Sequence, residues 1–130
     1  YCCDGKWIMI DLGLSFADEK FPGIDLLVPQ IDFLDQIKDN LEAVIISHGH
    51  EDHAGALAFF IDKINCPIYA TSFASSLIKR RLKEFGKLNS ANINIINPSQ
   101  SIILKCLSGH GRINSPVFRY YSKTLLFSCF

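Results

Sequence analysis

The chain has 130 residues, 48% of them apolar and 20% charged, which is ordinary for one globular domain and excludes disordered, collagen-like and coiled-coil chains. No apolar run reaches the roughly 18 residues of a membrane helix, so we expect no membrane segment. The five cysteines include no Cys-x-x-Cys pair, which argues against a disulfide framework and a cysteine zinc site. We therefore expect a reducing, cytoplasmic environment.

The formal net charge is zero, but the two halves of the chain differ strongly. Residues 1–62 contain 12 acidic and 3 basic side chains, whereas residues 63–130 contain 1 acidic and 10 basic ones. This asymmetry suggests an acidic site beside a surface that attracts a polyanion.

The first third of the sequence predicts little regular structure. Asp4-Gly5 before the apolar run 6–10 predicts a type I′ hairpin turn that feeds a strand. Because the chain opens at Tyr1 and not at methionine, we expect the first arm of this hairpin to be lost. The turn-rich segment 12–30 is predicted to be a loop, and the spacing of apolar residues in 31–39 predicts a short amphipathic helix.

From residue 41 onward, strands and helices alternate. Segment 41–47 is predicted to be a strand buried on both faces, as in a parallel or mixed sheet. A helix is predicted over 54–64, a strand over 68–70, and a helix from a Thr71 or Ser72 cap to Gly86. We expect the core face of this last helix to consist of Phe73, Leu77, Leu82 and Phe85. Further strands are predicted over 93–96 and 102–106, then a loop over 108–115 and no clear pattern over 120–130. We interpret the chain as one α/β domain, incomplete at both ends.

Three of the four histidines and one aspartate lie within six residues, His48-Gly49-His50-Glu51-Asp52-His53. A buried strand that ends at Ser47 would bring this segment to the edge of a sheet. If the turn is extended, His48, His50 and Asp52 project to one side and Glu51 to the other. Imidazole and carboxylate groups suit Zn²⁺, and His53 can turn toward a second ion, an arrangement suited to hydrolysis. A purely structural role would be costly for so many polar groups at a strand end.

The segment "HGHEDH" between "AVIIS" and "AGAL" resembles the signature of the metallo-β-lactamase fold, and "DLGLSF…PGIDLLVPQIDFL" resembles its ribonuclease J branch. The resemblance continues through "CPIYAT" to about Leu104. It implies a partial αββα sandwich over residues 1–104, and residues 105–130 are then a divergent tail, which we attribute to a frameshift or an early stop. Members of the branch are exo- and endoribonucleases.

The resemblance also implies two zinc ions, the first bound by His48 and His50 and the second by Asp52 and His53. Asp11 corresponds to an early aspartate that orients the histidine loop without binding the metal; a plain turn acid is the alternative. The family site further requires a later histidine, a bridging aspartate and a distant histidine.

The later ligands of the family are difficult to find in this chain. The only carboxylate side chains after His53 are Asp62 and Glu84, both in predicted helices, so we expect one chain not to complete a two-metal site. His110 is a candidate for the later zinc histidine, with an ordinary loop histidine as the alternative. We therefore expect a fragment of a ribonuclease J-like hydrolase that is inactive in isolation.

A cluster of basic residues lies on and just after the predicted helix that ends at Gly86. These residues are candidate RNA contacts, and a solvated helix face is the alternative: Lys79, Arg80, Arg81, Lys83 and Lys87. A second hypothesis for the chain is a non-catalytic remnant that binds RNA, a complementing C-terminal chain or another copy of itself. A third is a hydrolase of another substrate, such as a thioester or lactam, against which the "PGIDLLVP" segment argues.

Overall fold

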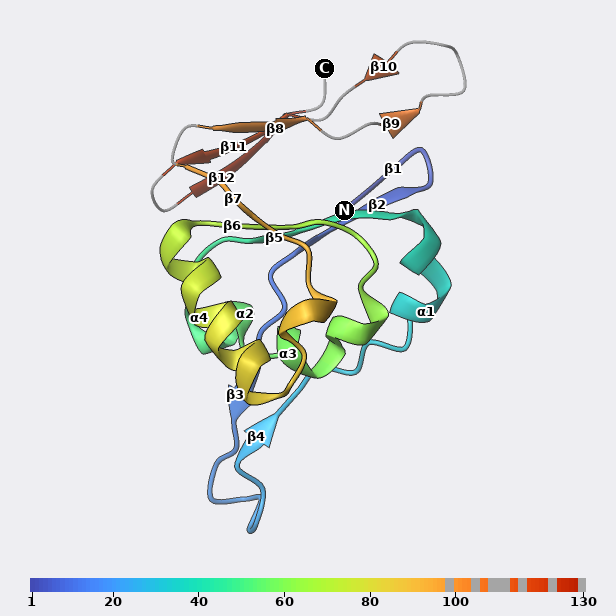
Figure 1. The fold of residues 1–130 in the computed structure, drawn as a ribbon. Helices are drawn as coiled ribbons and strands as arrows, with labels where there is room; N and C mark the ends of the chain where they lie inside the picture. The colour runs from blue at the N-terminus through green and yellow to red at the C-terminus, as the bar shows by residue number, and fades with distance from the viewer. Residues whose placement is uncertain (98–99, 104–105, 108–112, 115–116, 122–123, 129–130) are drawn as a thin grey trace.

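The computed structural model describes residues 1–97, 100–103, 106–107, 113–114, 117–121 and 124–128 (Figure 1). A five-stranded sheet of order β1-β2-β5-β6-β7 lies at the centre. Its strands are β1 Cys2–Cys3, β2 Lys6–Ile10, β5 Leu41–Ile46, β6 Ile68–Ala70 and β7 Ile93–Ile95. All neighbours are parallel except β1, which is antiparallel to β2, and this confirms the predicted α/β class.

The first two strands form the predicted hairpin, but with a first arm that the sequence analysis did not expect. Cys2 pairs with Trp7 and Cys3 with Lys6 across the turn, so two residues of the first arm are present in this chain. The turn residues Asp4 and Gly5 have φ values of 47° and 77°, as a type I′ turn requires.

The central strand β5 is buried on both faces, as its continuous apolar run predicts. Val44 and Ile46 belong to the core beneath the helices. Ala43 and Ile45 belong to a second core on the opposite face, together with Ile102. The last of these residues lies in β8 (Ser101–Ile103), so the sheet is covered on both sides.

The helices that cover the first face are short, except one. They are α1 Leu34–Ile37, α2 Glu51–Ala54, α3 Leu57–Phe60 and α4 Ser72–Glu84, with 3₁₀ turns at Lys38–Asn40, Ile61–Lys63 and Leu88–Ser90. The prediction of one helix over 54–64 was wrong. The N–H of Ala56 donates to the carbonyl oxygen of Leu12 (3.0 Å) and not to the preceding helical turn, which separates α2 from α3.

Helix α4 has the predicted ends but not the predicted core face. The Thr71 hydroxyl accepts from the N–H of Ala74, and the helix ends where the N–H of Lys87 donates to the Leu82 carbonyl. The buried positions are Ala74, Ser75, Ile78 and Leu82. Phe73 and Phe85 are 71% and 40% exposed, so their assignment to the core was wrong. The buried face thus includes the small residues Ala74 and Ser75, and Phe73 lies outside it.

Several short strands lie where the sequence predicted loops or no pattern. Within segment 12–30, β3 (Ser15–Phe16) pairs with β4 (Leu26–Leu27), and this hairpin projects from the bottom of the molecule in Figure 1. The remaining strands are β9 Cys106–Leu107, β10 Ile113–Asn114, β11 Val117–Tyr121 and β12 Thr124–Ser128. The order β12-β11-β8 makes a separate sheet. Among the described residues, no helix is long and apolar enough to cross a membrane.

Candidate metal centre

The candidate site lies where two neighbouring parallel strands end. Asp11 directly follows β2, and Ser47 and His48 directly follow β5. Because β2 and β5 pair in parallel, these residues meet at one edge of the sheet. Asp11 has a φ of 61°, a left-handed conformation that Asp tolerates better than most residues, and its N–H donates to the Ile45 carbonyl (2.9 Å).

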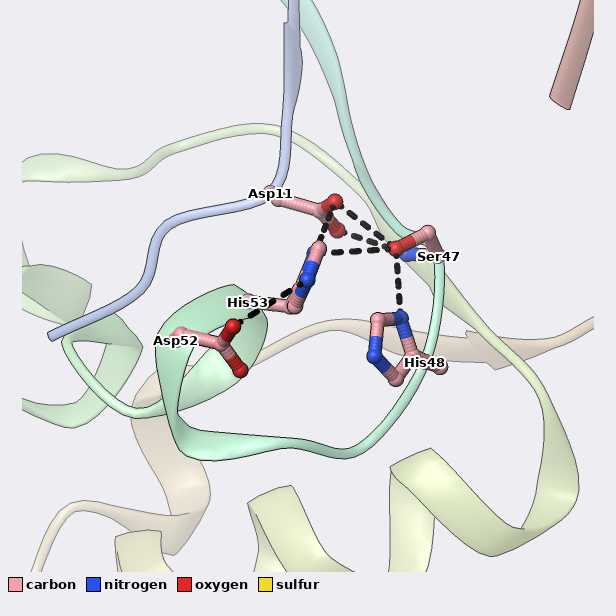
Figure 2. Close-up of polar contacts among 5 residues, drawn as sticks. All are labelled: Asp11, Ser47, His48, Asp52 and His53. Atoms are coloured by element: carbon pink, nitrogen blue, oxygen red, sulfur yellow. Dashed lines mark hydrogen bonds and ion pairs between the residues drawn. The ribbon is translucent and has the colours of Figure 1, made fainter. Parts of the chain in front are cut away.

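The Asp11 carboxylate connects the strand ends to the histidines (Figure 2). Its Oδ1 accepts the N–H of Ser47 at 2.7 Å, and its Oδ2 accepts the Ser47 hydroxyl, also at 2.7 Å. The same Oδ2 lies 2.7 Å from Nδ1 of His53. A neutral His53 that donates from Nδ1 leaves the lone pair of Nε2 free for a metal ion.

Three potential metal ligands come together in front of this network. One ligand atom from each of His48, His50 and Asp52 lies within 4.8 Å of the others. Donor atoms on one zinc ion, each at 2.0–2.2 Å, lie roughly 3.4 Å apart, so small side-chain rotations suffice for coordination. Two imidazoles and a carboxylate are also a suitable donor set, and the residues present therefore fit a metal ion.

The backbone of the loop differs from the extended turn that we expected. His50 is extended (ψ 153°), but helix α2 begins at Glu51, so the alternating pattern stops there. The helical start still brings Asp52 toward His48 and His50. Glu51 points elsewhere, because its Oε2 lies 3.4 Å from a terminal guanidinium nitrogen of Arg81 in α4.

His53 lies beside the three-residue group. Its ring centroid is 3.9 Å from that of His48, and its Nε2 is 3.5 Å from Oδ2 of Asp52. All four predicted ligands are thus at one end of the sheet. Their division between two ions stays a prediction.

Backbone contacts hold the loop against the segment after β2. The N–H of Leu12 donates to the His53 carbonyl (2.7 Å), and the N–H of Leu14 donates to the Glu51 carbonyl (2.9 Å). Between them, a β-carbon at Gly13 would overlap the carbonyl group of Asp52. Only glycine permits this close approach.

Sequence reasoning missed Ser47 as a member of the site. Its hydroxyl contacts Asp11 and also lies 3.0 Å from Nδ1 of His48 and 3.4 Å from Nδ1 of His53. The only signal was its position as the first polar residue after a buried strand.

The basic residues of α4 do not behave alike. Lys79, Arg80 and Lys83 are exposed, whereas Arg81 is half-buried and lies between Glu51 (3.4 Å) and Glu84 (3.8 Å).

The later carboxylates are engaged outside the metal group. Asp62 pairs with Lys87 at 2.6 Å, and Glu84 pairs with Arg80 at 3.8 Å. His110, the candidate late ligand, lies outside the described residues.

Comparison with known proteins agrees with the motif. Residues 3–105 match the family model of the metallo-beta-lactamase superfamily. The chain is 35% identical over 101 residues to ribonuclease J 1 of Streptococcus pyogenes, covering 78% of this chain and 18% of that protein. It is 42% identical over 76 residues to ribonuclease J of Sinorhizobium meliloti, covering 58% and 14% of the two chains. For ribonuclease J of Thermus thermophilus, identity is 37% over 100 residues, covering 72% and 18%.

The chain spans less than a fifth of the length of these three relatives. The resemblance to the ribonuclease J branch is nevertheless confirmed over the N-terminal four fifths of the chain. With its parallel sheet, its His-His-Asp group at a strand end and a family match over residues 3–105, the chain belongs to the metallo-beta-lactamase superfamily.

Proposed function

We propose that this chain supplies part of the zinc site of a hydrolase that cleaves RNA phosphodiester bonds, as the name of its ribonuclease J relatives indicates for them. The observation that carries the proposal is the grouping of His48, His50 and Asp52 within 4.8 Å at the end of a parallel strand. In this proposal, His48 and His50 bind the first zinc ion, and Asp52 and His53 bind the second.

The chain's own residues would hold the donors in place. Asp11 orients His53 through Nδ1, and the Ser47 hydroxyl contacts both the Asp11 carboxylate and Nδ1 of His48. When bound, the zinc ions supply the Lewis acidity that activates water and neutralises the phosphate. The backbone bonds of Leu12 and Leu14 fix the loop that presents these donors.

We propose that the isolated chain is inactive, because Asp62 and Glu84 are paired with basic residues and neither stands in the metal group. The missing ligands would come from His110, from a complementing C-terminal chain or from a second copy. Residues 1–104 would then form the metallo-β-lactamase part and residues 105–130 a divergent tail, in a cytoplasmic protein.

The exposed bases of α4, Lys79, Arg80 and Lys83, support a second candidate function, the binding of RNA without catalysis. RNA affinity that falls with salt and is insensitive to a chelator would favour this role. Arg81 is a weaker candidate for RNA contact because Glu51 and Glu84 already occupy its guanidinium group.

The decisive experiment is the zinc content of the monodisperse gel-filtration peak, measured by elemental analysis. We expect bound zinc that is lost in His48→Ala, while His110→Ala shows whether that histidine contributes a ligand. A folded wild-type chain without zinc would contradict the zinc site. Chelator-sensitive RNA cleavage that disappears in His50→Ala would contradict only the proposed inactivity.

A further inference from the structure

Two phenylalanines on different elements expose their rings beside the candidate metal loop. Phe73 and Phe16, at 71% and 70%, are the most exposed large apolar side chains among those that the structure describes. Exposure of this size is unusual for phenylalanine, which elsewhere contributes most when buried. Their shared position next to one loop calls for an explanation that treats them together.

Phe16 stands at a hollow that also contains candidate metal ligands. The hollow has a volume of about 690 Å³ and is lined by residues 14–16 on one wall and residues 49–52 on the other, so His50 and Asp52 face the same space. Phe16 is held by its pairing with Leu26 in the β3–β4 hairpin. The N–H of Leu14, just before this hairpin, donates to the Glu51 carbonyl and so ties the start of β3 to the loop.

Phe73 approaches the same loop from α4. A β-carbon at Gly49 would lie 3.7 Å from Cδ1 of Phe73, so the ring is next to the glycine between the two histidines. The Thr71 cap fixes the helical turn that carries Phe73. Arg80 is seven residues further on the same helix face, about 10 Å along the axis. Its side chain is exposed and lies 3.8 Å from Glu84, so a cationic group stands on the same face as the ring.

We propose that Phe16 and Phe73 are stacking platforms for the bases of single-stranded RNA that lies across the metal loop. The inference rests on the proposed function, since it names how that site would hold its substrate. Every base has a π-face that can stack on a phenyl ring, and a basic surface can follow the backbone. The hollow shared with the His50 and Asp52 donors favours a nucleic-acid occupant over an apolar protein surface, as do the exposed bases on the helix that carries Phe73, which are Lys79, Arg80 and Lys83.

The test measures binding of a fluorescein-labelled riboadenylate octamer to the full chain by anisotropy, at fixed salt and in the presence of a chelator. We expect Phe16→Ala and Phe73→Ala each to weaken binding roughly 5- to 150-fold, and Phe→Trp at either position to retain it. Phe21→Ala is the matched control, because Phe21 is also exposed (45%) but does not line the hollow. An octamer with 2-aminopurine should show quenching that both alanine variants lose.

The inference is wrong if the wild-type chain does not bind the octamer, or if Phe16→Ala and Phe73→Ala bind it as tightly as the Phe21→Ala control does. It is also wrong if the wild-type chain is a dimer and Phe16→Ala becomes a monomer with unchanged RNA affinity. The last result would mean that the ring covers another copy of the chain. Because RNA binding is measured without metal, failure of the zinc site does not alter this readout. Circular dichroism of each variant verifies that it is folded.

Discussion

Replacement of Asp11 by asparagine tests whether this carboxylate orients the candidate metal ligands. Asparagine has the same shape and tolerates the observed φ of 61°, so the backbone can stay as it is. Its amide oxygen can still accept the N–H of Ser47, which lies 2.7 Å from Oδ1. The amide nitrogen takes the place of Oδ2, which accepts hydrogen bonds from the Ser47 hydroxyl and from Nδ1 of His53. An amide nitrogen can only donate, so neither of these bonds can form as before.

The substitution should affect metal affinity more than stability. Two hydrogen bonds to a charged group are lost, each worth about 1.5–3 kcal/mol, but the Ser47 hydroxyl can rotate and His53 can change tautomer. We therefore expect the free energy of unfolding to fall by only about 1–2 kcal/mol. The new tautomer of His53 carries its proton on Nε2, which removes a ligand, so metal affinity should fall roughly 10- to 100-fold.

Zinc affinity is measured by competition with a chromophoric chelator, and stability by urea unfolding of the metal-free chain. Asp18→Asn is the matched control, because Asp18 is exposed and its Oδ1 accepts a backbone N–H two residues away (2.9 Å) without contact with the loop. A folded Asp11→Asn variant whose zinc affinity matches that of the control would refute the orienting role.

Three further substitutions or conditions test other parts of the structure. Gly13→Ala should abolish zinc binding and destabilise the fold, because the new β-carbon would overlap the Asp52 carbonyl group. Gly23→Ala is the control: it has open space around it but a φ of 82°, so the free energy of unfolding in urea should fall by only about 1–2 kcal/mol. Leu82→Ala should lower the free energy of unfolding by about 2–5 kcal/mol, since Leu82 is fully buried, and Phe85→Ala by clearly less; equal effects would contradict the observed core face of α4. Burial raises the pKa of the Cys66 thiol to about 11 from 9.0, so between pH 9 and 11 the folded state keeps a proton that the unfolded state releases. The free energy of unfolding should therefore fall as the pH rises through this range. If it falls just as steeply with pH in Cys66→Ala, the reasoning is wrong.

The elements that could be predicted are those whose local pattern and tertiary environment agree. The apolar run of β5 is buried on both faces, and the Thr71 cap marks the start of α4. The His48–His53 motif could be identified because histidines and an aspartate are rarely so close without a shared chemical task. The strand before it also predicted correctly that the motif lies at a sheet edge.

The failures arise where packing and not the local pattern decides the structure. Phe73 and Phe85 fit an apolar stripe in the sequence, but the buried face of α4 contains the smaller Ala74 and Ser75 instead. The helix predicted over 54–64 is interrupted because Ala56 bonds to Leu12, which is far away in the sequence. The role of Ser47 depends on three side chains from two strand ends, and no window of sequence contains all of them.

Several of the contacts that hold the candidate ligands lie outside their metal-binding atoms. His53 is fixed through Nδ1 and its backbone carbonyl, while its Nε2 faces Oδ2 of Asp52 at 3.5 Å, another candidate ligand atom. Asp52 is fixed because its carbonyl group packs on Gly13, which leaves its carboxylate exposed. A metal ion would therefore meet a loop that is already ordered, so little of its binding energy would be needed for folding. One side of the loop is hydrogen-bonded to the segment after β2, and the other side lines the hollow next to Phe16. His50 and Asp52 are exposed because they lie on the side of the hollow.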